Sequence, residues 1–148
     1  MTTIPQRPIV CRGIRGATTV EANTAEDIVE ATGELLRVLV ALNDLRPEDI
    51  ASATFTTTPD LDATFPALAR EGLGWDEVPL LCGHEMAVPG ALTRVVRVLL
   101  HVNTTRSASE VRHVYLKDAR ALRPAWAIAD DDLAAILDRP DPVAAGVD

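Results

Sequence analysis

At 148 residues, with 47% hydrophobic and 24% charged residues, the chain has the size and composition of one globular domain. Its formal net charge of −8 excludes a sequence-independent nucleic-acid binder, because the overall field repels phosphate. No stretch approaches the roughly 18 uninterrupted apolar residues of a membrane span, and Cys11 and Cys82 form neither a disulfide framework nor a metal-ligand pattern.

The two ends of the chain predict little structure. Residues 1–8 lack the apolar segment of a signal peptide, so we expect a cytoplasmic protein in which these residues are an N-terminal extension. Residues 138–148, with two prolines and several small residues, predict a flexible tail. We expect residues 1–148 to form a single domain.

The first predicted elements are a strand and a long helix. Residues 9–14 predict a strand, followed by a loop at the sheet edge that carries Arg15. Thr24 with Asp27 resembles a capping box, and apolar residues then recur at helical spacing. A helix over residues 25–43 is therefore expected.

The middle of the chain predicts a strand and a short helix. Residues 50–58 follow a turn at 46–49 and are rich in β-branched side chains, which favours a strand. Residues 65–73 predict a helix with Pro66 in its first turn, ended by the glycines that follow.

The second half of the chain adds three strands and a helix. Strands are predicted over residues 78–82, 95–102 and 111–116, and the first of them opens onto a loop at 83–90. Residues 130–137 predict a short acidic helix. This order of elements predicts an α/β (α+β) domain in which a mixed β-sheet packs against helices.

Arg97 is the most informative candidate for chemistry. It lies in an otherwise apolar strand and shares its face with Val95 and Leu99, so we expect its guanidinium to point into an apolar region. A buried arginine costs several kcal/mol unless an anion or acceptor meets it. Two interpretations stay open: an internal salt bridge to an acid such as Glu85, or a cation held ready for a bound anion.

The other charged and aromatic candidates are ambiguous by themselves. Arg15 is either a solvated charge or part of a loop-built site, and Tyr115 is either a packing residue or a ligand contact. His84, His101 and His113 have no ligand spacing, so no metal site is expected.

Two chemistries are open at residues 82–85. Cys82 and His84 suggest a nucleophilic pair, but we expect their side chains to point to opposite sides of an extended segment, which disfavours it. Alternatively, Glu85 accepts a hydrogen bond from a substrate hydroxyl.

Taken together, these segments resemble the AroH class of chorismate mutases, the small trimeric α/β enzymes. The matching blocks are RGIRGATTVE at 12–21, TPDL at 58–61, FPA at 65–67, Cys82 with Glu85 and Met86, RV at 97–98, RHVYL at 112–116 and LRP at 122–124. The resemblance implies a homotrimer that forms a pseudo α/β barrel, with active sites at the subunit interfaces. It also implies chorismate as the small-molecule substrate, prephenate as the product, and no cofactor.

Roles of individual residues follow from the resemblance alone. It implies that Arg97 approaches the ether oxygen of the breaking bond and that Arg15 and Tyr115 hold a substrate carboxylate. Glu85, with Cys82 beside it, matches the groups that take the ring hydroxyl. Wall positions are matched by Phe65 and Ala67, and Arg123 matches a basic residue near the C-terminal segment that covers the site.

The chain departs from the family pattern after its Phe-Pro pair. Leu68 stands where members commonly carry a lysine, and the arginine slightly further along is matched by Arg70 to within one residue. We expect weaker binding of a substrate carboxylate, seen in KM more than in kcat. Two alternatives remain: a homologue repurposed to bind or rearrange a chorismate-like metabolite, and a trimeric deaminase or binding protein of the RidA type.

Overall fold

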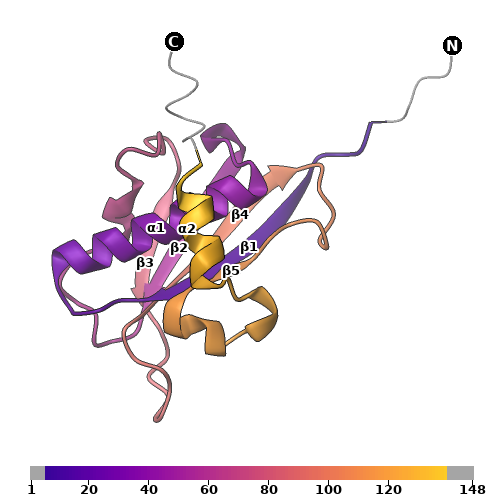
Figure 1. Cartoon of the computed structure of the whole chain (residues 1–148). Coiled ribbons are helices and arrows are strands. Elements are labelled where there is room, and N and C mark those ends of the chain that lie inside the picture. Colours follow the sequence, from indigo (N-terminus) through magenta and orange to yellow (C-terminus); the bar gives the residue numbers. More distant parts are fainter. Residues whose placement is uncertain (1–5, 140–148) are drawn as a thin grey trace, which may run out of the picture.

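The long helix is found where the sequence predicts it, in a computed structural model that describes residues 6–139. Helix α1 spans Ala25–Asn43 (Figure 1). The hydroxyl of Thr24 caps it by accepting a hydrogen bond from the backbone N–H of Asp27 at 3.1 Å. Leu35 and Leu39, on its inner face, are fully buried. Capping and apolar spacing are therefore confirmed as the local signals that set this helix.

Within residues 6–139, five strands form the expected mixed sheet. At its centre lies β4 (Val95–Thr104), with β1 (Val10–Thr19) and β2 (Ile50–Thr57) antiparallel to it on either side. The edge strand β5 (Val114–Tyr115) runs parallel to β1, and the other edge strand β3 (Leu80–His84) runs parallel to β2. The strand order is β3-β2-β4-β1-β5.

One face of the sheet is covered by helices. The second helix α2, Asp130–Leu137, matches the acidic helix expected there and packs beside α1 on the same side of the sheet (Figure 1). Ile14, Phe55 and Leu100 point from three strands into the core beneath α1. The helical layer therefore buries the apolar side chains that alternate along β1, β2 and β4.

The opposite face, here called the open face, is covered by neither α1 nor α2, and only its β5 end is packed by the turns after β5 (Figure 1). Strand register defines its rows, because directly paired residues project to the same side. Arg97 on β4 pairs with Ala17 on β1 and with Thr56 on β2. In the next row Leu99 pairs with Arg15 and is 37% exposed. The open face thus mixes guanidiniums, hydroxyls and aliphatic groups.

Strand β1 is longer than expected, and this corrects the placement of Arg15. The segment continues its ladder with β4 through Thr19, between β4 and β5, so Arg15 lies within an inner strand and the sheet-edge expectation is wrong. Gly16 weakens the strand pattern in the sequence, but a side chain there would force neighbouring core side chains to shift. An added Cβ would approach Leu39 Cδ1 of α1 to 2.8 Å.

Other predicted boundaries also shift. The helix expected over residues 65–73 is a single 3-10 turn, η2 (Pro66–Arg70), and the strand expected over 78–82 begins later and runs into the expected loop as β3. The strand expected over 111–116 pairs at only two residues. Its first part is held instead by Asn43, whose amide accepts from the N–H of Arg112 at 2.7 Å and donates to its carbonyl at 2.9 Å.

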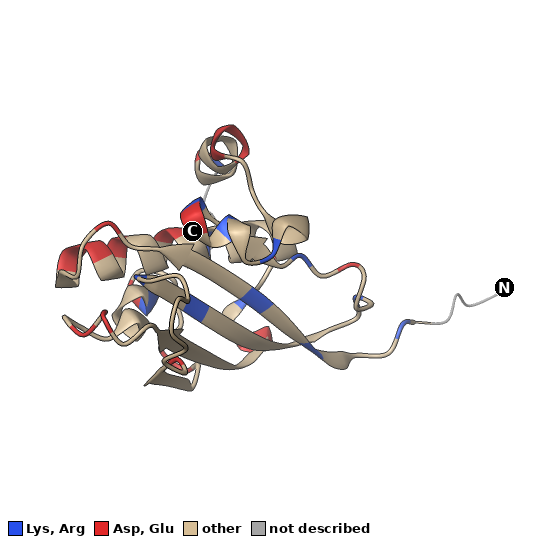
Figure 2. Cartoon of the chain, turned by 90° about the horizontal axis from the view of Figure 1, so that it is seen from below, with Lys and Arg blue, Asp and Glu red and all other residues tan. Residues whose placement is uncertain are grey.

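Charge is distributed unevenly over the two layers. Acidic residues lie along α1 and α2 and the charged residues within the strands are basic, while both signs occur on the connecting segments (Figure 2). No helix within the described range is long and apolar enough to cross a bilayer. The tail expected over residues 138–148 and the extension expected over residues 1–8 fall largely outside the described residues, so those two predictions stay open.

Candidate active site

Arg97 and Glu85 meet on the open face. Glu85 follows β3 directly, and its Oε1 lies 3.4 Å from Arg97 Nε. The hydroxyl of Thr56, which pairs with Arg97 across the sheet, donates a hydrogen bond to the same Oε1. The internal ion pair considered for Arg97 is therefore present, and Thr56 fixes the carboxylate from the neighbouring strand.

The surroundings of Arg97 differ from the apolar region expected from sequence. Its side chain is 33% exposed, because neither α1 nor α2 covers this face of the sheet. The Nε atom itself is buried and makes no hydrogen bond, since the contact with Glu85 is an ion pair by distance without hydrogen-bond geometry. The guanidinium is thus held in place while part of its donor capacity is unused.

Arg15 and Tyr115 form a second group one strand away. The guanidinium carbon of Arg15 lies 6.0 Å from the centre of the Tyr115 ring. Ala17 pairs with both Tyr115 and Arg97, so the three residues form one row across β5, β1 and β4. The Tyr115 hydroxyl is buried without a partner, and a buried donor left unpaired costs about 1–3 kcal/mol.

The segment after β5 brings Arg123 close to this second group. The η3 (Lys117–Ala121) and η4 (Pro124–Trp126) turns fold over Tyr115. The guanidinium carbon of Arg123 lies 3.7 Å from the centre of the Trp126 ring. Arg15 and Arg123 are therefore brought to the same end of the open face by two different segments.

His113 lies between the two arginines. Its Nδ1 accepts a hydrogen bond from the backbone N–H of Arg15 at 3.0 Å, which leaves the proton of the neutral ring on Nε2. Burial, together with the charges of Arg123 and Arg15, lowers the pKa of His113 below its usual value. A neutral ring is what the hydrogen bond to Arg15 requires.

The remaining predicted residues lie elsewhere in the chain. Phe65, which is 68% exposed, Ala67 and Arg70 belong to the η2 region, which packs against α1 and β3. Cys82 pairs with Phe55, so its side chain starts on the helix-facing side of β3. Because β3 and β5 are opposite edges, four strand spacings, roughly 19 Å, separate Cys82 from Tyr115. The η2 region packs against α1, on the helix-covered side of the sheet, whereas Tyr115 lies in the row of Arg97 on the open face.

The Cys82–His84 pair needs a correction. Two residues apart on β3, they share a face, so the expectation that they point to opposite sides is wrong. His84 Nδ1 instead contacts the Thr57 hydroxyl at 3.1 Å, and that hydroxyl donates to the Leu61 carbonyl at 3.2 Å. The imidazole is thereby engaged away from the thiol.

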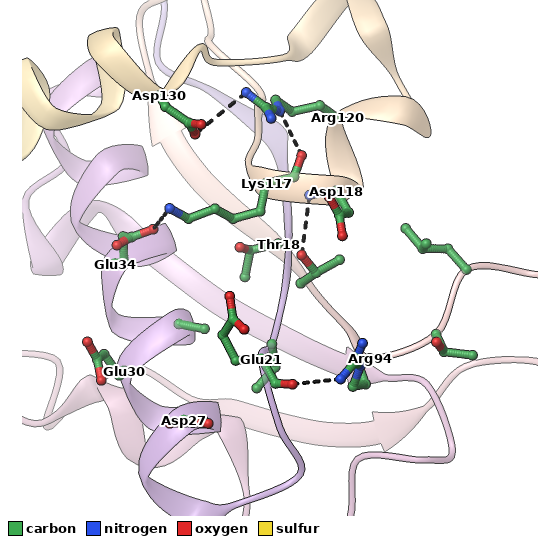
Figure 3. A pocket seen from close by; sticks show the side chains of 15 residues that line it. Thr18, Glu21, Asp27, Glu30, Glu34, Arg94, Lys117, Asp118, Arg120 and Asp130 are labelled. Carbon is green, nitrogen blue, oxygen red and sulfur yellow. Dashed lines mark hydrogen bonds and ion pairs between the residues drawn. The ribbon is translucent and has the colours of Figure 1, made fainter.

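A cavity of about 460 Å³ opens between α1 and the segment after β5 (Figure 3). None of the predicted site residues lines it, and its lining has six acidic and three basic side chains. Lys117 and Arg120 face Glu34 and Asp130 at 3.8 and 3.6 Å. The cavity is therefore unsuited to an anion. Among residues 6–139, no three His, Cys, Asp or Glu side chains gather as around a metal.

Three residues near the site were not predicted as site residues. Thr56 is one of several threonines at the end of β2, and nothing in the sequence marks it out. His113 has no metal-ligand spacing, and nothing else in the sequence gives its ring a role at the site. Trp126 is one of two tryptophans in the chain and follows the Arg-Pro pair by two residues, which was the available signal.

Comparisons with known proteins identify the family of the chain. The family model described as chorismate mutase type I matches residues 11–126. The chain is 45% identical over 117 residues to chorismate mutase AroH of Bacillus subtilis, covering 78% of this chain and 92% of that protein. It is 49% identical over 114 residues to chorismate mutase AroH of Thermus thermophilus, covering 76% and 93%.

A solved structure shares the fold. A chorismate mutase from Clostridium thermocellum superposes with a TM-score of 0.73 at 46% sequence identity, covering 74% of this chain and 98% of that one. The likeness therefore extends over nearly the whole of the smaller protein.

Proposed function

The chain belongs to the family of type I chorismate mutases, and from this premise we propose which of its residues convert chorismate to prephenate. Family membership makes it an isomerase of aromatic amino-acid biosynthesis. The proposal concerns the roles of individual side chains, the assembly that completes the site and the compartment in which it works.

The chemistry needs position and charge rather than a nucleophile. Chorismate is a dianion, and its Claisen rearrangement is unimolecular, with no net proton transfer. The protein has to hold the side chain folded over the ring, and it has to stabilise negative charge on the ether oxygen as the C–O bond breaks ahead of C–C formation. Both tasks suit fixed guanidiniums.

We assign stabilisation of the ether oxygen to Arg97. The observation that carries this assignment is its buried, unbonded Nε beside Glu85, on a face open to a ligand. Among the described residues, four buried side-chain polar atoms have no hydrogen-bond partner, and those of Arg97 and Tyr115 both lie in the predicted site. Such donors are stabilised when an anion meets them.

Arg15 and Tyr115 are assigned to a substrate carboxylate. The Tyr115 hydroxyl is a buried donor without a partner, and the Arg15 guanidinium lies over the same ring. Arg123 adds a third cationic group from the C-terminal side. One carboxylate held at this end places the breaking bond in the direction of Arg97, two strands away.

Glu85 is assigned to the ring hydroxyl. Thr56 and Arg97 occupy one of its oxygens, which leaves the other for a substrate donor. Cys82 follows the family pattern beside it, although its side chain starts on the other face of β3.

We further propose a homotrimer with active sites between subunits. Phe65, Ala67 and Arg70 belong to a segment that packs against α1, on the helix-covered side of the sheet, whereas Tyr115 lies on the open face, so we expect them to join its site from another chain. The open face also exposes Leu99 and Leu81, which are 37% and 73% accessible. Aliphatic groups on an uncovered sheet face favour packing against another copy.

A cytoplasmic setting is part of the same proposal. Cys11 and Cys82 are both unpaired and exposed, which fits a reducing compartment.

The test is turnover by the purified protein. Chorismate absorbance should fall as prephenate appears, without added metal and with or without a thiol reductant. Dependence on a metal or on a reduced thiol would overturn the electrostatic mechanism. Absence of turnover with binding of a chorismate-like molecule would support the repurposed alternative. Sedimentation should give the mass of three chains, and a monomer with full activity would overturn the interfacial site.

A further inference from the structure

The rings of His113, Tyr115 and Trp126 pack together at the Tyr115 end of the open face, next to Arg15 and Arg123. The His113 and Trp126 rings have centroids 4.0 Å apart, and the Tyr115 and Trp126 rings have centroids 5.7 Å apart. Trp126 thus contacts both rings of the β5 region and also carries the guanidinium of Arg123 at 3.7 Å. One side chain connects the two segments that supply cations to the site.

We propose that Trp126 is a positioning residue, which holds the Arg123 guanidinium against its ring and so presents it to the substrate carboxylate beside Arg15. The inference rests on the proposed function, because the role of Arg123 toward that carboxylate is itself part of the proposal. Trp126 does not touch the substrate in this arrangement and acts through Arg123.

The energetic reason is the flexibility of arginine. A free arginine side chain has several rotatable bonds, and holding it in one geometry costs up to about 2 kcal/mol in rotamer entropy. A guanidinium stacked on an indole face is attracted by the ring and is held before the ligand arrives. Pre-organisation of this kind appears in binding, because less freedom is lost when the carboxylate binds.

The backbone near Trp126 is anchored independently of its side chain. The N–H of Ile128 donates to the Tyr115 carbonyl at 3.0 Å, and Ala127 forms a parallel bridge with Tyr115. The N–H of Trp126 itself donates to the Arg123 carbonyl at 2.9 Å. Replacing the indole is therefore expected to leave the segment docked on β5.

The His113 ring reinforces the arrangement from the other side. It accepts the backbone N–H of Arg15 and stacks against Trp126, so the two arginines share one aromatic support. A displacement of the Trp126 ring is therefore expected to move both guanidiniums, and to move that of Arg123 more, because Arg123 stacks directly on the ring.

The test is a double-mutant cycle between Trp126 and Arg123. Trp126→Leu should raise KM for chorismate roughly 2- to 30-fold, the range to which cation–π interactions correspond, with kcat within a factor of two. Trp126→Phe keeps a ring face and should recover most of the loss. In an Arg123→Ala background, Trp126→Leu should raise KM no further.

Controls separate this inference from the proposed function. Arg120→Ala removes a cation of the same segment that pairs with Asp130, and its KM should stay at the wild-type value. Arg123→Ala should shift the fluorescence of Trp126, while Trp75, 1% exposed in the core, supplies a constant background. An inactive wild type would overturn the proposed function. If the wild type is active and Trp126→Leu leaves KM unchanged, the inference about Trp126 is overturned and the proposed function stands. The same holds if Trp126→Leu raises KM by the same factor in the Arg123→Ala background as it does when Arg123 is present.

Discussion

Replacing Arg97 with alanine should lower turnover strongly while changing the free energy of unfolding only slightly. The side chain projects from the central strand β4 onto the open face and contacts Glu85 at 3.4 Å. Both partners are partly exposed, 33% and 26%, so the ion pair contributes only about 0–1 kcal/mol to the free energy of unfolding. In a domain of this size, that corresponds to a fall in Tm of at most about 4 °C.

The expected effect on turnover is much larger. Loss of one preorganised donor to a developing oxyanion lowers kcat by roughly 10²–10³, or about 2.7–4 kcal/mol. Two charges about 4 Å apart interact by about 4 kcal/mol at the effective dielectric of a protein surface, which supports the upper part of that range. Arg97→Lys keeps the charge without the planar fork and should fall between alanine and wild type.

The assay is chorismate consumption under saturating substrate, with fold verified by circular dichroism and thermal unfolding. Arg46→Ala is the matched control, because Arg46 is also ion-paired but lies far out on the surface at 68% exposure. Its kcat should equal that of the wild type. A natively folded Arg97→Ala variant with kcat within tenfold of wild type would refute the assignment of Arg97 to the ether oxygen.

Three further predictions concern packing, pH and the site rim. Gly16→Ala should lower the free energy of unfolding by about 1–3 kcal/mol in urea titrations, because its Cβ would meet Leu39 Cδ1 at 2.8 Å; Gly13→Ala, with 3.5 Å to its nearest neighbour, should change it little. Burial and two nearby guanidiniums lower the pKa of His113 in the folded protein. Below pH 6.5 the unfolded chain therefore binds more protons at this position than the folded one, and the free energy of unfolding should fall as the pH drops. If His113→Gln shows the same dependence of the free energy of unfolding on pH, this explanation is wrong. Leu68→Lys should lower KM with kcat unchanged, and an unchanged KM would show that this position lies outside carboxylate binding.

Helix α1 was predictable because its signals are local. The Thr24 cap and the spacing of its leucines depend only on residues within a few turns, and its bounds matched. Strand ends were less predictable. Gly16 interrupts the β pattern of β1 for a reason that lies in α1, and the first part of the strand expected over residues 111–116 is held by the distant Asn43.

The candidate site divides in the same way. Arg97 was singled out because a guanidinium in an apolar strand is unusual, and that argument needs only neighbours in sequence. The expectation that it is enclosed by apolar groups was wrong, because strand alternation cannot tell which face of a sheet a helix will cover. Thr56 had no local pattern that marked it, since its partners Arg97 and Glu85 lie on other segments.

The sequence by itself determined the family, the helix, most of the strands and the identity of the charged residues, because these depend on residue types and short spacings. Only the tertiary structure decided which of those residues meet. It placed Arg97 with Glu85, brought Arg15, Tyr115 and Arg123 to one end of the open face, and left η2 packed against α1. Pairing across a sheet joins residues far apart in the chain, and no local pattern encodes the register that brings them together.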